Sequence, residues 1–236
     1  MSEFVSIIIT TLNEEDYIED CLKSLRNQTY ARKEIIVVDS NSKDKTINIA
    51  KKYADKIIIQ NCIMPVGRNI GAKEARGDIL LFVDADITLL PNWIDIVLPR
   101  LREENAVAVY GDLLPKEGKL RAWLVYIKEE LSNLILRKAQ TPCFGKLGTA
   151  VAIKRNAFKK VGGFTERNAC GEDIDMSLRL REYGKIKFIR NAKGYVSTRR
   201  FEKSGYLKLS LLWFLIGCYY ILTKKELLPR YSRDYP

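Results

Sequence analysis

The sequence predicts an α/β fold in which an open, mainly parallel sheet is flanked by helices. In the first half of the chain, short continuous runs of apolar, often β-branched residues alternate with stretches whose apolar side chains recur at helical spacing. Continuous apolar runs are typical of strands that are buried on both faces of a parallel sheet. Strands that alternate with helices in this way form a right-handed, open α/β sheet.

Four apolar runs predict strands in this half, and the segments between them predict helices. The expected strands are Val5–Thr10, Glu34–Val38, Lys56–Gln60 and Ile79–Val83. The expected helices are a segment with apolar residues from Tyr17 to Leu25, a segment that Asp44 caps and that runs to Tyr53, and Gly67–Ala75.

The second half predicts fewer elements. In chain order they are a helix from Trp93 to about Glu104, a strand at Val107–Tyr110, an amphipathic helix at Leu120–Leu136, a strand at Gly148–Ile153 and a second amphipathic helix at Glu172–Tyr183. The segment Leu207–Thr223 is apolar on every helical face and must be buried in protein or in lipid. It falls short of the ~20 residues that a spanning helix needs. Its Trp and Tyr residues and the flanking cations favour a helix in a membrane interface, with a helix docked on the core as the alternative.

Polar side chains follow three of the four predicted strands of the first half. Asn13 and Glu14 follow the first strand, Asp39 the second, and Asp84 and Asp86 the fourth. Open α/β sheets bind ligands outside the carboxyl ends of their strands. We therefore expect these groups to converge on one site.

The net charge of +11 is unevenly distributed. Residues 1–114 carry 14 basic and 18 acidic side chains, whereas residues 115–160 carry 11 and 3, and residues 197–236 carry 8 and 3. The two basic stretches are also rich in Trp, Leu, Tyr and Ile, which suits an anionic membrane surface better than a nucleic acid. The chain has no histidine, so metal chemistry would fall to carboxylates. Scattered cysteines and the lack of a secretory signal pattern lead us to expect a location at the cytoplasmic face of the membrane.

The sequence Asp84-Ala85-Asp86 is the sharpest local signal. Two carboxylates on a tight turn after a buried strand can hold a hard divalent cation, which can bridge the phosphates of a nucleoside diphosphate. Most D-x-D sequences are solvated turns, which is the alternative interpretation. The position at a strand end favours the metal site.

Three further residues of the first half are candidate ligand contacts. Asp39 can accept hydrogen bonds from the N–H edge of a base, or it can simply cap the turn that follows it. Arg68 and Asn69 lie in a predicted turn, Gly67–Gly71, where a guanidinium and a helix N-terminus could meet phosphate. An ordinary surface arginine is the alternative.

Glu172 and Asp173 begin a predicted helix after Gly171. Acidic residues in a first turn are favoured by the helix dipole, so capping would explain one of them. With Asp175 as well, there are more carboxylates than a cap requires. We therefore expect one of the adjacent pair to act as a general base toward an acceptor hydroxyl.

Together, these residues resemble the pattern of glycosyltransferase family 2, whose members have the GT-A fold with its Rossmann-like sheet. The resemblance covers residues 4 to about 185. It rests on TTLNEE, EIIVVDSNSKDKT, GRNIGAKEARGDILLFVDAD, GGF and GEDIDMSLRLREYG, in this order. The family inverts the anomeric carbon, so the resemblance implies a single in-line displacement.

The resemblance also implies roles for the site residues. The nucleoside pocket would be lined by Thr11, Asn13, Glu14 and Asp39. Arg68, with Asn69 beside it, would lie near the base or the diphosphate, and Asp84 and Asp86 would bind Mg²⁺ or Mn²⁺. Asp173 would be the catalytic base, with Glu172 next to it. Arg199 or Arg200 would contact the donor diphosphate or an acceptor phosphate, or would instead belong to a lipid-facing basic patch. Some members use a downstream histidine as a third metal ligand, and Ser197 lies near where it would fall.

The resemblance predicts a GT-A catalytic domain at residues 1–200, with a nucleotide-sugar-binding half at 1–90 and an acceptor-binding half at 91–200. Residues 201–236 would form a basic, apolar segment that associates with the membrane. The expected reaction moves a hexosyl group from GDP-mannose or UDP-glucose to a polyprenyl phosphate, a glycolipid or another glycan. A sugar-phosphate nucleotidyltransferase is a rival, but it would have a Gly-rich loop after the first strand. A basic nucleic-acid-binding module is a second rival, but the expected ligand edge is acidic, so we expect no nucleic acid as a partner.

Overall fold

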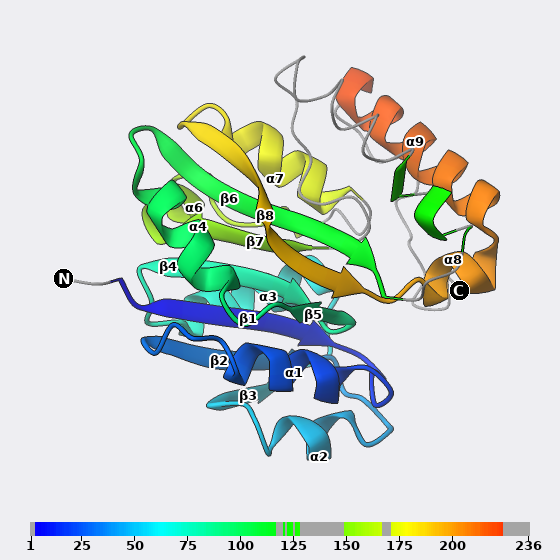
Figure 1. Cartoon of the computed structure of the whole chain (residues 1–236), viewed down its shortest axis with the longest axis horizontal. Helices are drawn as coiled ribbons and strands as arrows, with labels where there is room; N and C mark the ends of the chain where they lie inside the picture. Colours follow the sequence, from blue (N-terminus) through cyan, green and yellow to red (C-terminus); the bar gives the residue numbers. More distant parts are fainter. Residues whose placement is uncertain are drawn as a thin grey trace.

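The computed structural model describes residues 3–116, 120, 122–124, 126, 127, 149–166 and 171–223. Its centre is an eight-stranded sheet with the strand order β3-β2-β1-β4-β7-β6-β8-β5. Helices lie on both faces of this curled, open sheet (Figure 1). The α/β prediction is therefore confirmed.

The first half of the chain forms the parallel part of the sheet. Its strands are β1 (Val5–Thr11), β2 (Lys33–Asp39), β3 (Lys56–Ile59) and β4 (Ile79–Asp84). All neighbouring pairs among these four strands are parallel. Each predicted strand is present, with bounds that differ by one residue at most at either end.

The helices of the first half are α1 (Ile18–Arg26), α2 (Thr46–Ala50) and α3 (Met64–Glu74). The prediction that the second helix runs to Tyr53 is wrong, because the N–H groups of Lys52 and Tyr53 bond three residues back and the chain tightens into turns. The Asp44 carboxylate does accept the N–H of Thr46, at 2.9 Å. The predicted turn around Arg68 is also wrong, since α3 begins at Met64 with a proline in its first turn.

The second half adds strands of mixed direction. In chain order its elements are β5 (Ile87–Leu89), α4 (Trp93–Arg102), β6 (Ala106–Pro115), β7 (Ala150–Lys154), α6 (Arg155–Lys160), α7 (Glu172–Leu180), β8 (Lys185–Val196), α8 (Arg199–Ser204) and α9 (Tyr206–Thr223). β7 is antiparallel to both β4 and β6, and β5 is antiparallel to β8. The sheet is thus mixed, and the expectation of a mainly parallel sheet holds best for the first half.

Two strands were not predicted from the sequence. β5 is only three residues long, which is too short to show a period. β8 alternates basic and apolar residues in its first part, and several of its side chains are exposed. It lies between β6 and the edge strand β5.

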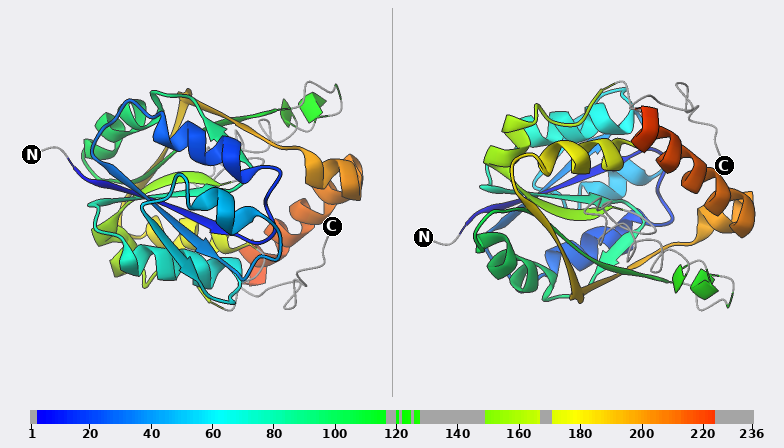
Figure 2. Two further views of the ribbon diagram at one scale, coloured as in Figure 1. Left: turned by 90° about the horizontal axis from the view of Figure 1, so that it is seen from below. Right: turned by 90° about the horizontal axis from the view of Figure 1, so that it is seen from above.

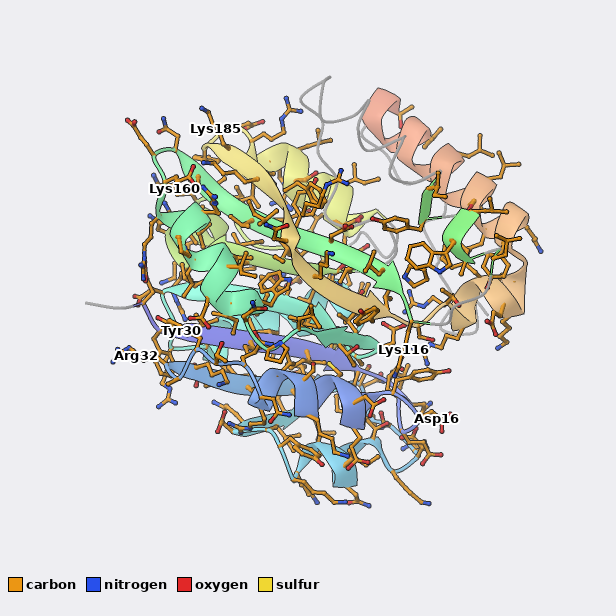
Figure 3. All side chains as sticks on the ribbon, in the orientation of Figure 1. Asp16, Tyr30, Arg32, Lys116, Lys160 and Lys185 are labelled. Carbon is orange, nitrogen blue, oxygen red and sulfur yellow. The ribbon has the colours of Figure 1, made fainter. Side chains whose placement is uncertain are left out.

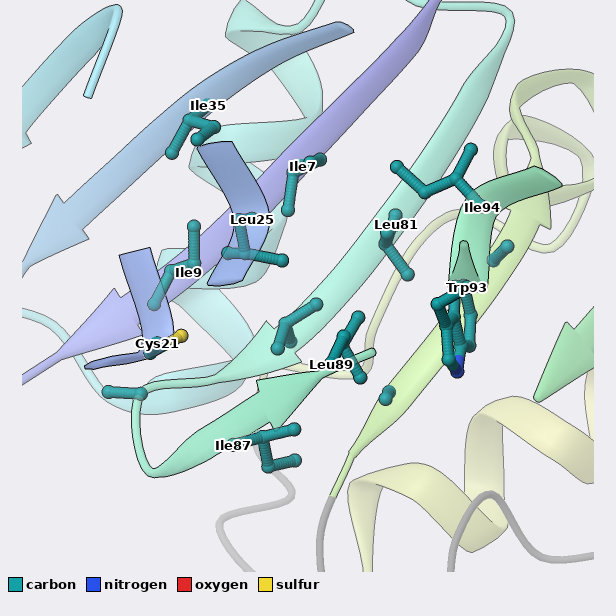
Figure 4. Close-up of a cluster of buried hydrophobic side chains, with 14 of the residues drawn as sticks. Ile7, Ile9, Cys21, Leu25, Ile35, Leu81, Ile87, Leu89, Trp93 and Ile94 are labelled. Carbon is teal, nitrogen blue, oxygen red and sulfur yellow. The ribbon is translucent and has the colours of Figure 1, made fainter. Parts of the chain in front are cut away.

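The sheet separates two hydrophobic clusters. Ile7 and Ile9 of β1 face a cluster with α1 and α4, part of which Figure 4 shows around Leu25, Leu81 and Trp93. Ile8, between them, faces the cluster on the other side with Phe82, Phe158, Phe164 and Met176. Because both faces of the strand are buried, its sequence is a continuous apolar run.

The carboxyl ends of the strands lie at one edge of the sheet. Thr11 at the end of β1 pairs with Asp39, and Thr10 pairs with Asp84. The convergence predicted for these polar residues is confirmed. α8, α9 and the described part of residues 120–127 lie toward the same end of the molecule, opposite the N-terminus (Figure 2).

The described residues from 120 to 127 are helical at Leu120, Ala122–Leu124, Tyr126 and Ile127. The rest of the predicted helix Leu120–Leu136 lies outside the described residues. Leu120, Leu124 and Ile127 are each more than half exposed. The Tyr126 hydroxyl donates to the buried Asp112 carboxylate at 3.0 Å, which ties this segment to β6.

α9 confirms the helix predicted at Leu207–Thr223, although not its membrane role. Leu209 is 2% exposed, whereas Leu211 and Leu215 are 55% and 49% exposed. Burial on the protein therefore accounts for only part of the apolar surface described for this helix. Among the described residues, no helix is both long enough and apolar enough to cross a bilayer.

The close packing of α3 on β1 gives a first prediction. A Cβ atom at Gly71 would lie 2.4 Å from Ile8 Cγ2, whereas one at Gly67 would lie 3.0 Å from Thr10 Cγ2. Both glycines gain about 1 kcal/mol of helix propensity on substitution by alanine. We expect Gly71→Ala nevertheless to lower the free energy of unfolding by about 1–3 kcal/mol through overpacking, and Gly67→Ala to lower it less. Urea denaturation of both variants measures the difference, and equal stabilities would contradict the close approach at Gly71.

Candidate active site

Asp39 organises the loops at the carboxyl edge of the sheet. Its carboxylate accepts hydrogen bonds from the Thr11 hydroxyl at 2.8 Å and from the Ser42 N–H and hydroxyl at 2.7 and 2.6 Å. The side chain is buried, and these three donors fix its orientation. Capping of the following turn, one of the two interpretations of Asp39, is therefore present in the structure. Contact with a nucleobase stays a prediction.

The loop after β1 is fastened to the loop after β2. Asn13 has a left-handed backbone with a φ of 55°, and its N–H donates to the Ser42 hydroxyl at 2.8 Å. The Asn13 side-chain oxygen accepts the Lys43 N–H at 2.8 Å, and the Glu14 N–H donates to the Thr46 hydroxyl at 2.8 Å. The polar residues of TTLNEE thus shape this edge through hydrogen bonds to the second loop.

Asp84, at the end of β4, is held from two sides. Its Oδ1 accepts from Arg68 at 2.7 Å, and its Oδ2 accepts the Thr149 N–H at 2.8 Å. Thr149 also accepts the Asp84 N–H through its carbonyl oxygen. Thr149 begins the segment that leads into β7, and its role was not predicted because the contact joins residues that are far apart in the sequence.

Asp86 differs from Asp84 in having a carboxylate that accepts no hydrogen bond from the described side chains. Arg199 lies 3.6 Å from its Oδ2. Burial raises the pKa of Asp86 to about 6, and the Asp84 carboxylate adds to this rise while Arg200 and Arg199 oppose it. The carboxylate is therefore in a place where its negative charge is poorly stabilised by the protein.

The donor chemistry of this turn fits a hard divalent cation. Asp84 and Asp86 both present carboxylate oxygens, the ligands that Mg²⁺ and Mn²⁺ prefer. A cation beside Asp86 would offset the unfavourable burial of its charge. Within the described ranges no group of three or more His, Cys, Asp or Glu side chains is arranged to hold a metal, so phosphate oxygens and water would supply the other ligands.

Arg68 joins the D-x-D turn to the start of α7. It lies in the interior of α3 and is 2% exposed. Besides its ion pair with Asp84, it donates to Glu172 Oε1 at 3.1 Å, and its guanidinium lies 5.2 Å from the ring centre of Phe164. Arg68 is therefore a buried group with carboxylate partners on two elements, and the surface-arginine interpretation is wrong.

Glu172 and Asp173 form the first turn of α7 after Gly171, which has a left-handed backbone. Burial raises the pKa of Glu172 to about 7, with Arg68 opposing and Asp173 adding to the rise. Burial likewise raises the pKa of Asp173, whose Oδ1 accepts the Ile174 N–H at 2.8 Å. Both carboxylates are thus shifted toward the proton-accepting range of a general base.

Asp175, the third acid of this helix, takes part in a structural network of hydrogen bonds. Its carboxylate accepts the Thr165 hydroxyl at 2.7 Å and is paired with Arg179. Arg179 also donates to the carbonyl oxygens of Val161 and Gly163 at 2.6 and 2.7 Å. This network fixes the Gly-Gly-Phe turn against α7.

Asn69, on α3, forms hydrogen bonds to the same turn. Its side-chain oxygen accepts the Phe164 N–H and its amide donates to the Phe164 carbonyl oxygen, both at 2.8 Å. The structure thus gives Asn69 a backbone partner, and contact with a nucleotide sugar stays a prediction. The ring of Phe164 then lies against Arg68, a contact that the sequence did not reveal.

Arg199 connects the start of α8 to the loop after β1. Its guanidinium donates hydrogen bonds to both carboxylate oxygens of Glu14, at 2.6 and 2.5 Å. It also lies 4.1 Å from the ring centre of Tyr17. Two residues predicted to bind the donor, Glu14 and Arg199, therefore bind each other beside Asp86. Arg200 is close enough to influence the pKa of Asp86.

Known proteins share this arrangement of sequence and fold. The family model described as "Glycosyl transferase family 2" matches residues 6–162. A putative glycosyltransferase of Bacillus subtilis, EpsH, is 36% identical over 111 residues, which cover 44% of this chain and 32% of the relative. The cholesterol galactosyltransferase of Borreliella burgdorferi is 26% identical over 230 residues, which cover 88% of this chain and 62% of the relative. The chain thus spans only about a third to two thirds of the length of these relatives.

Solved structures agree on the fold. A mannosyltransferase from Pyrobaculum calidifontis, in complex with GDP-Man and Mn²⁺, matches with a TM-score of 0.73 at 19% identity, covering 97% of this chain and 67% of that chain. The S. aureus protein TarS matches with a TM-score of 0.64 at 18% identity, covering 90% of this chain and 65% of that chain. The family match extends over more than half of the residues and includes the strands that end at Asp39 and Asp84 and the turn that carries Asp86. The chain therefore belongs to glycosyl transferase family 2 and has the GT-A fold.

Proposed function

We propose that this glycosyltransferase moves a hexosyl group, with inversion, from a nucleoside-diphosphate sugar of the GDP-mannose or UDP-glucose type to a membrane-linked acceptor. The acceptor class is a polyprenyl phosphate or a glycolipid. The observation that carries the proposal is the buried connection from Asp84 through Arg68 to Glu172, next to Asp173. It unites a pair of metal-type carboxylates with a pair of potential bases at one edge of the sheet.

Residues 1–90 form the donor half in this proposal. Thr11, Asn13, Glu14 and Asp39 shape the nucleoside side, and Asp84 and Asp86 hold Mg²⁺ or Mn²⁺. When bound, the cation neutralises charge on the leaving diphosphate. The GDP-Man and Mn²⁺ in the Pyrobaculum complex support this choice of donor and metal.

Residues 91–200 form the acceptor half. An acceptor oxygen attacks the anomeric carbon as the bond to the diphosphate breaks, and the nucleoside diphosphate leaves with the bonding electrons. Asp173 takes the proton when the acceptor is a hydroxyl. A phosphate acceptor is already anionic, so that its attack releases no proton and needs no strong base.

Exposed apolar side chains at the end of the molecule that carries the site support a lipid acceptor. The half-exposed apolar residues Leu120, Leu124, Ile127, Leu211 and Leu215 lie on the segments that extend beyond the carboxyl edge. Lys116, labelled in Figure 3, lies at this edge and pairs with Asp20 at 2.8 Å. The relatives include a beta-monoglucosyldiacylglycerol synthase of Nostoc, 28% identical over 192 residues. We propose peripheral binding to an anionic membrane at its cytoplasmic face, with residues 201–236 as the anchoring segment.

The metal assignment predicts that Asp86→Ala abolishes divalent-dependent binding of GDP or UDP and transfer from the corresponding sugar donor. Its fold should persist, because Asp86 accepts no hydrogen bond from the described side chains. Titration calorimetry of each nucleotide with and without Mn²⁺ measures the effect. Asp16→Ala, an exposed residue at the same edge, is the matched control and should bind normally. Full activity of the wild-type protein in EDTA would refute the metal assignment.

The base assignment predicts that Asp173→Asn lowers kcat by ~10²–10⁴ for a hydroxyl acceptor and much less for a polyprenyl phosphate. The base must be ionised, so wild-type transfer to the hydroxyl should fall as the pH drops through the pKa of Asp173. Burial raises this pKa, so the fall should begin at a higher pH than for an ordinary aspartate. Steady-state rates with both acceptor types across pH test this, and an equal loss with both would assign Asp173 a different role.

The membrane assignment predicts that the protein sediments with vesicles containing phosphatidylglycerol, and that high salt weakens this binding without abolishing it. Substituting the exposed Leu211 and Leu215 by glutamate should release the protein and reduce transfer to lipid acceptors more than donor hydrolysis. Ile59→Glu, at a similarly exposed apolar residue of β3, is the control and should still sediment. Wild-type protein that stays in solution beside such vesicles would refute the membrane assignment.

A further inference from the structure

Arg68 is the most deeply buried cation of the described site. It is 2% exposed, and its two terminal nitrogens are divided between two carboxylates, Asp84 at 2.7 Å and Glu172 at 3.1 Å. The face of its guanidinium lies against Phe164. A guanidinium is a rigid, planar fork, so it holds two partners at a fixed separation, which a flexible lysine does not.

The partners of Arg68 come from opposite sides of the reaction centre. Asp84 ends β4 and belongs to the metal-type pair, whereas Glu172 begins α7 and adjoins the base Asp173. Arg68 and Glu172 are 104 residues apart in the sequence, so this contact is purely tertiary. Through Arg68, the donor carboxylate Asp84 is directly linked to the helix that carries the base.

The first turn of α7 lacks the usual means of fixing a helix start. Its N-cap is Gly171, which offers no side-chain cap to the free N–H groups. At the end of this turn the Asp175 carboxylate is anchored to Thr165 and Arg179, whereas at its start the Glu172 carboxylate is anchored to Arg68. The Asp173 carboxylate itself accepts the Ile174 N–H within the same turn, so its position relative to Asp84 depends on the ion pair of Glu172 with Arg68.

We propose that Arg68 is a positioning residue that sets the distance between the leaving diphosphate and the base. Glu172 connects Arg68 to the first turn of α7 and does not act as a second base. Arg68 holds Asp84 with one nitrogen and the first turn of α7 with the other. Asp173 is then presented at a fixed place relative to the D-x-D turn. This inference rests on the proposed function and assigns Arg68 a role other than donor binding.

Kinetics of Arg68→Lys and Glu172→Gln with a hydroxyl acceptor test the proposal. Misplacement of a base by about 1 Å can lower the rate ~10²-fold, so we expect each variant to lose about that factor in kcat while the KM for the donor changes less than about five-fold. The double variant should lose no more than the worse single variant, because the two residues act as one unit. A raised donor KM with unchanged kcat, or multiplying losses, would overturn the proposal.

Arg179→Lys is the matched control, because Arg179 also pairs with a carboxylate of α7 but has no contact with Asp84. We expect it to lower the Tm yet leave kcat within about three-fold. An equal loss of kcat in this variant would show that any loosening of α7 has the same effect, and would overturn the special role of Arg68.

Hydrogen exchange separates failure of this inference from failure of the proposed function, because it needs no substrate. In folded Arg68→Lys and Glu172→Gln, the amides of Ile174 and Asp175, which bond to the Asp173 carboxylate and the Gly171 carbonyl oxygen, should exchange faster than in the wild-type protein, while those near Leu180 should not. Unchanged exchange at the first turn would overturn the inference even if transfer occurs. Lack of transfer by the wild-type protein with every donor and acceptor tested would instead count against the proposed function alone.

Discussion

The buried guanidinium of Arg68 is the interaction on which the candidate site depends. Removing an ion from water costs several kcal/mol even after the surroundings relax, so a buried ion pair is a poor way to gain stability. Here the cation lies among Asp84, Glu172 and Asp173, whose negative charges favour it despite its burial. Loss of the cation would leave these carboxylates buried and facing one another. One buried cation thus links three elements: α3, the end of β4 and the start of α7 must pack so that Arg68 stays paired with its carboxylates.

A second arginine has a different kind of environment. Arg199 is 26% exposed in its side chain, and its partners Glu14 and Asp86 lie at the rim of the same site. A partly exposed cation is screened by water more than a fully buried one, so its pairs can exchange at a lower energetic cost. The site therefore combines a fixed cation between its two halves with an adjustable cation near the proposed diphosphate position. Asp86, whose charge is poorly stabilised, lies next to the adjustable one.

The sequence predicted the parts of this structure that depend on local pattern. The strands β1, β2 and β4 are apolar on both faces, and Asp39, Asp84 and Asp86 follow such strands, so their convergence followed from strand direction alone. β8 was missed because basic side chains interrupt its apolar pattern, and Arg68 was placed in a turn because glycines surround it. Its partners were not predictable, since pairing between α3 and α7 is decided by tertiary packing. Thr149 acts through backbone contacts that leave no motif, and the GGF motif does not reveal that the ring of Phe164 lies against Arg68.

The alternation of Ile7, Ile8 and Ile9 between the two hydrophobic clusters has a consequence for how such a chain can vary in length. Removing or adding one residue within β1 would turn every later side chain of the strand to the opposite face. It would also shift Thr10 and Thr11 out of line with Asp84 and Asp39, with which they are paired. A single insertion or deletion in β1 would thus disrupt both the hydrophobic core and the candidate site. A single-residue insertion or deletion is therefore compatible with this fold in the loops but not within β1.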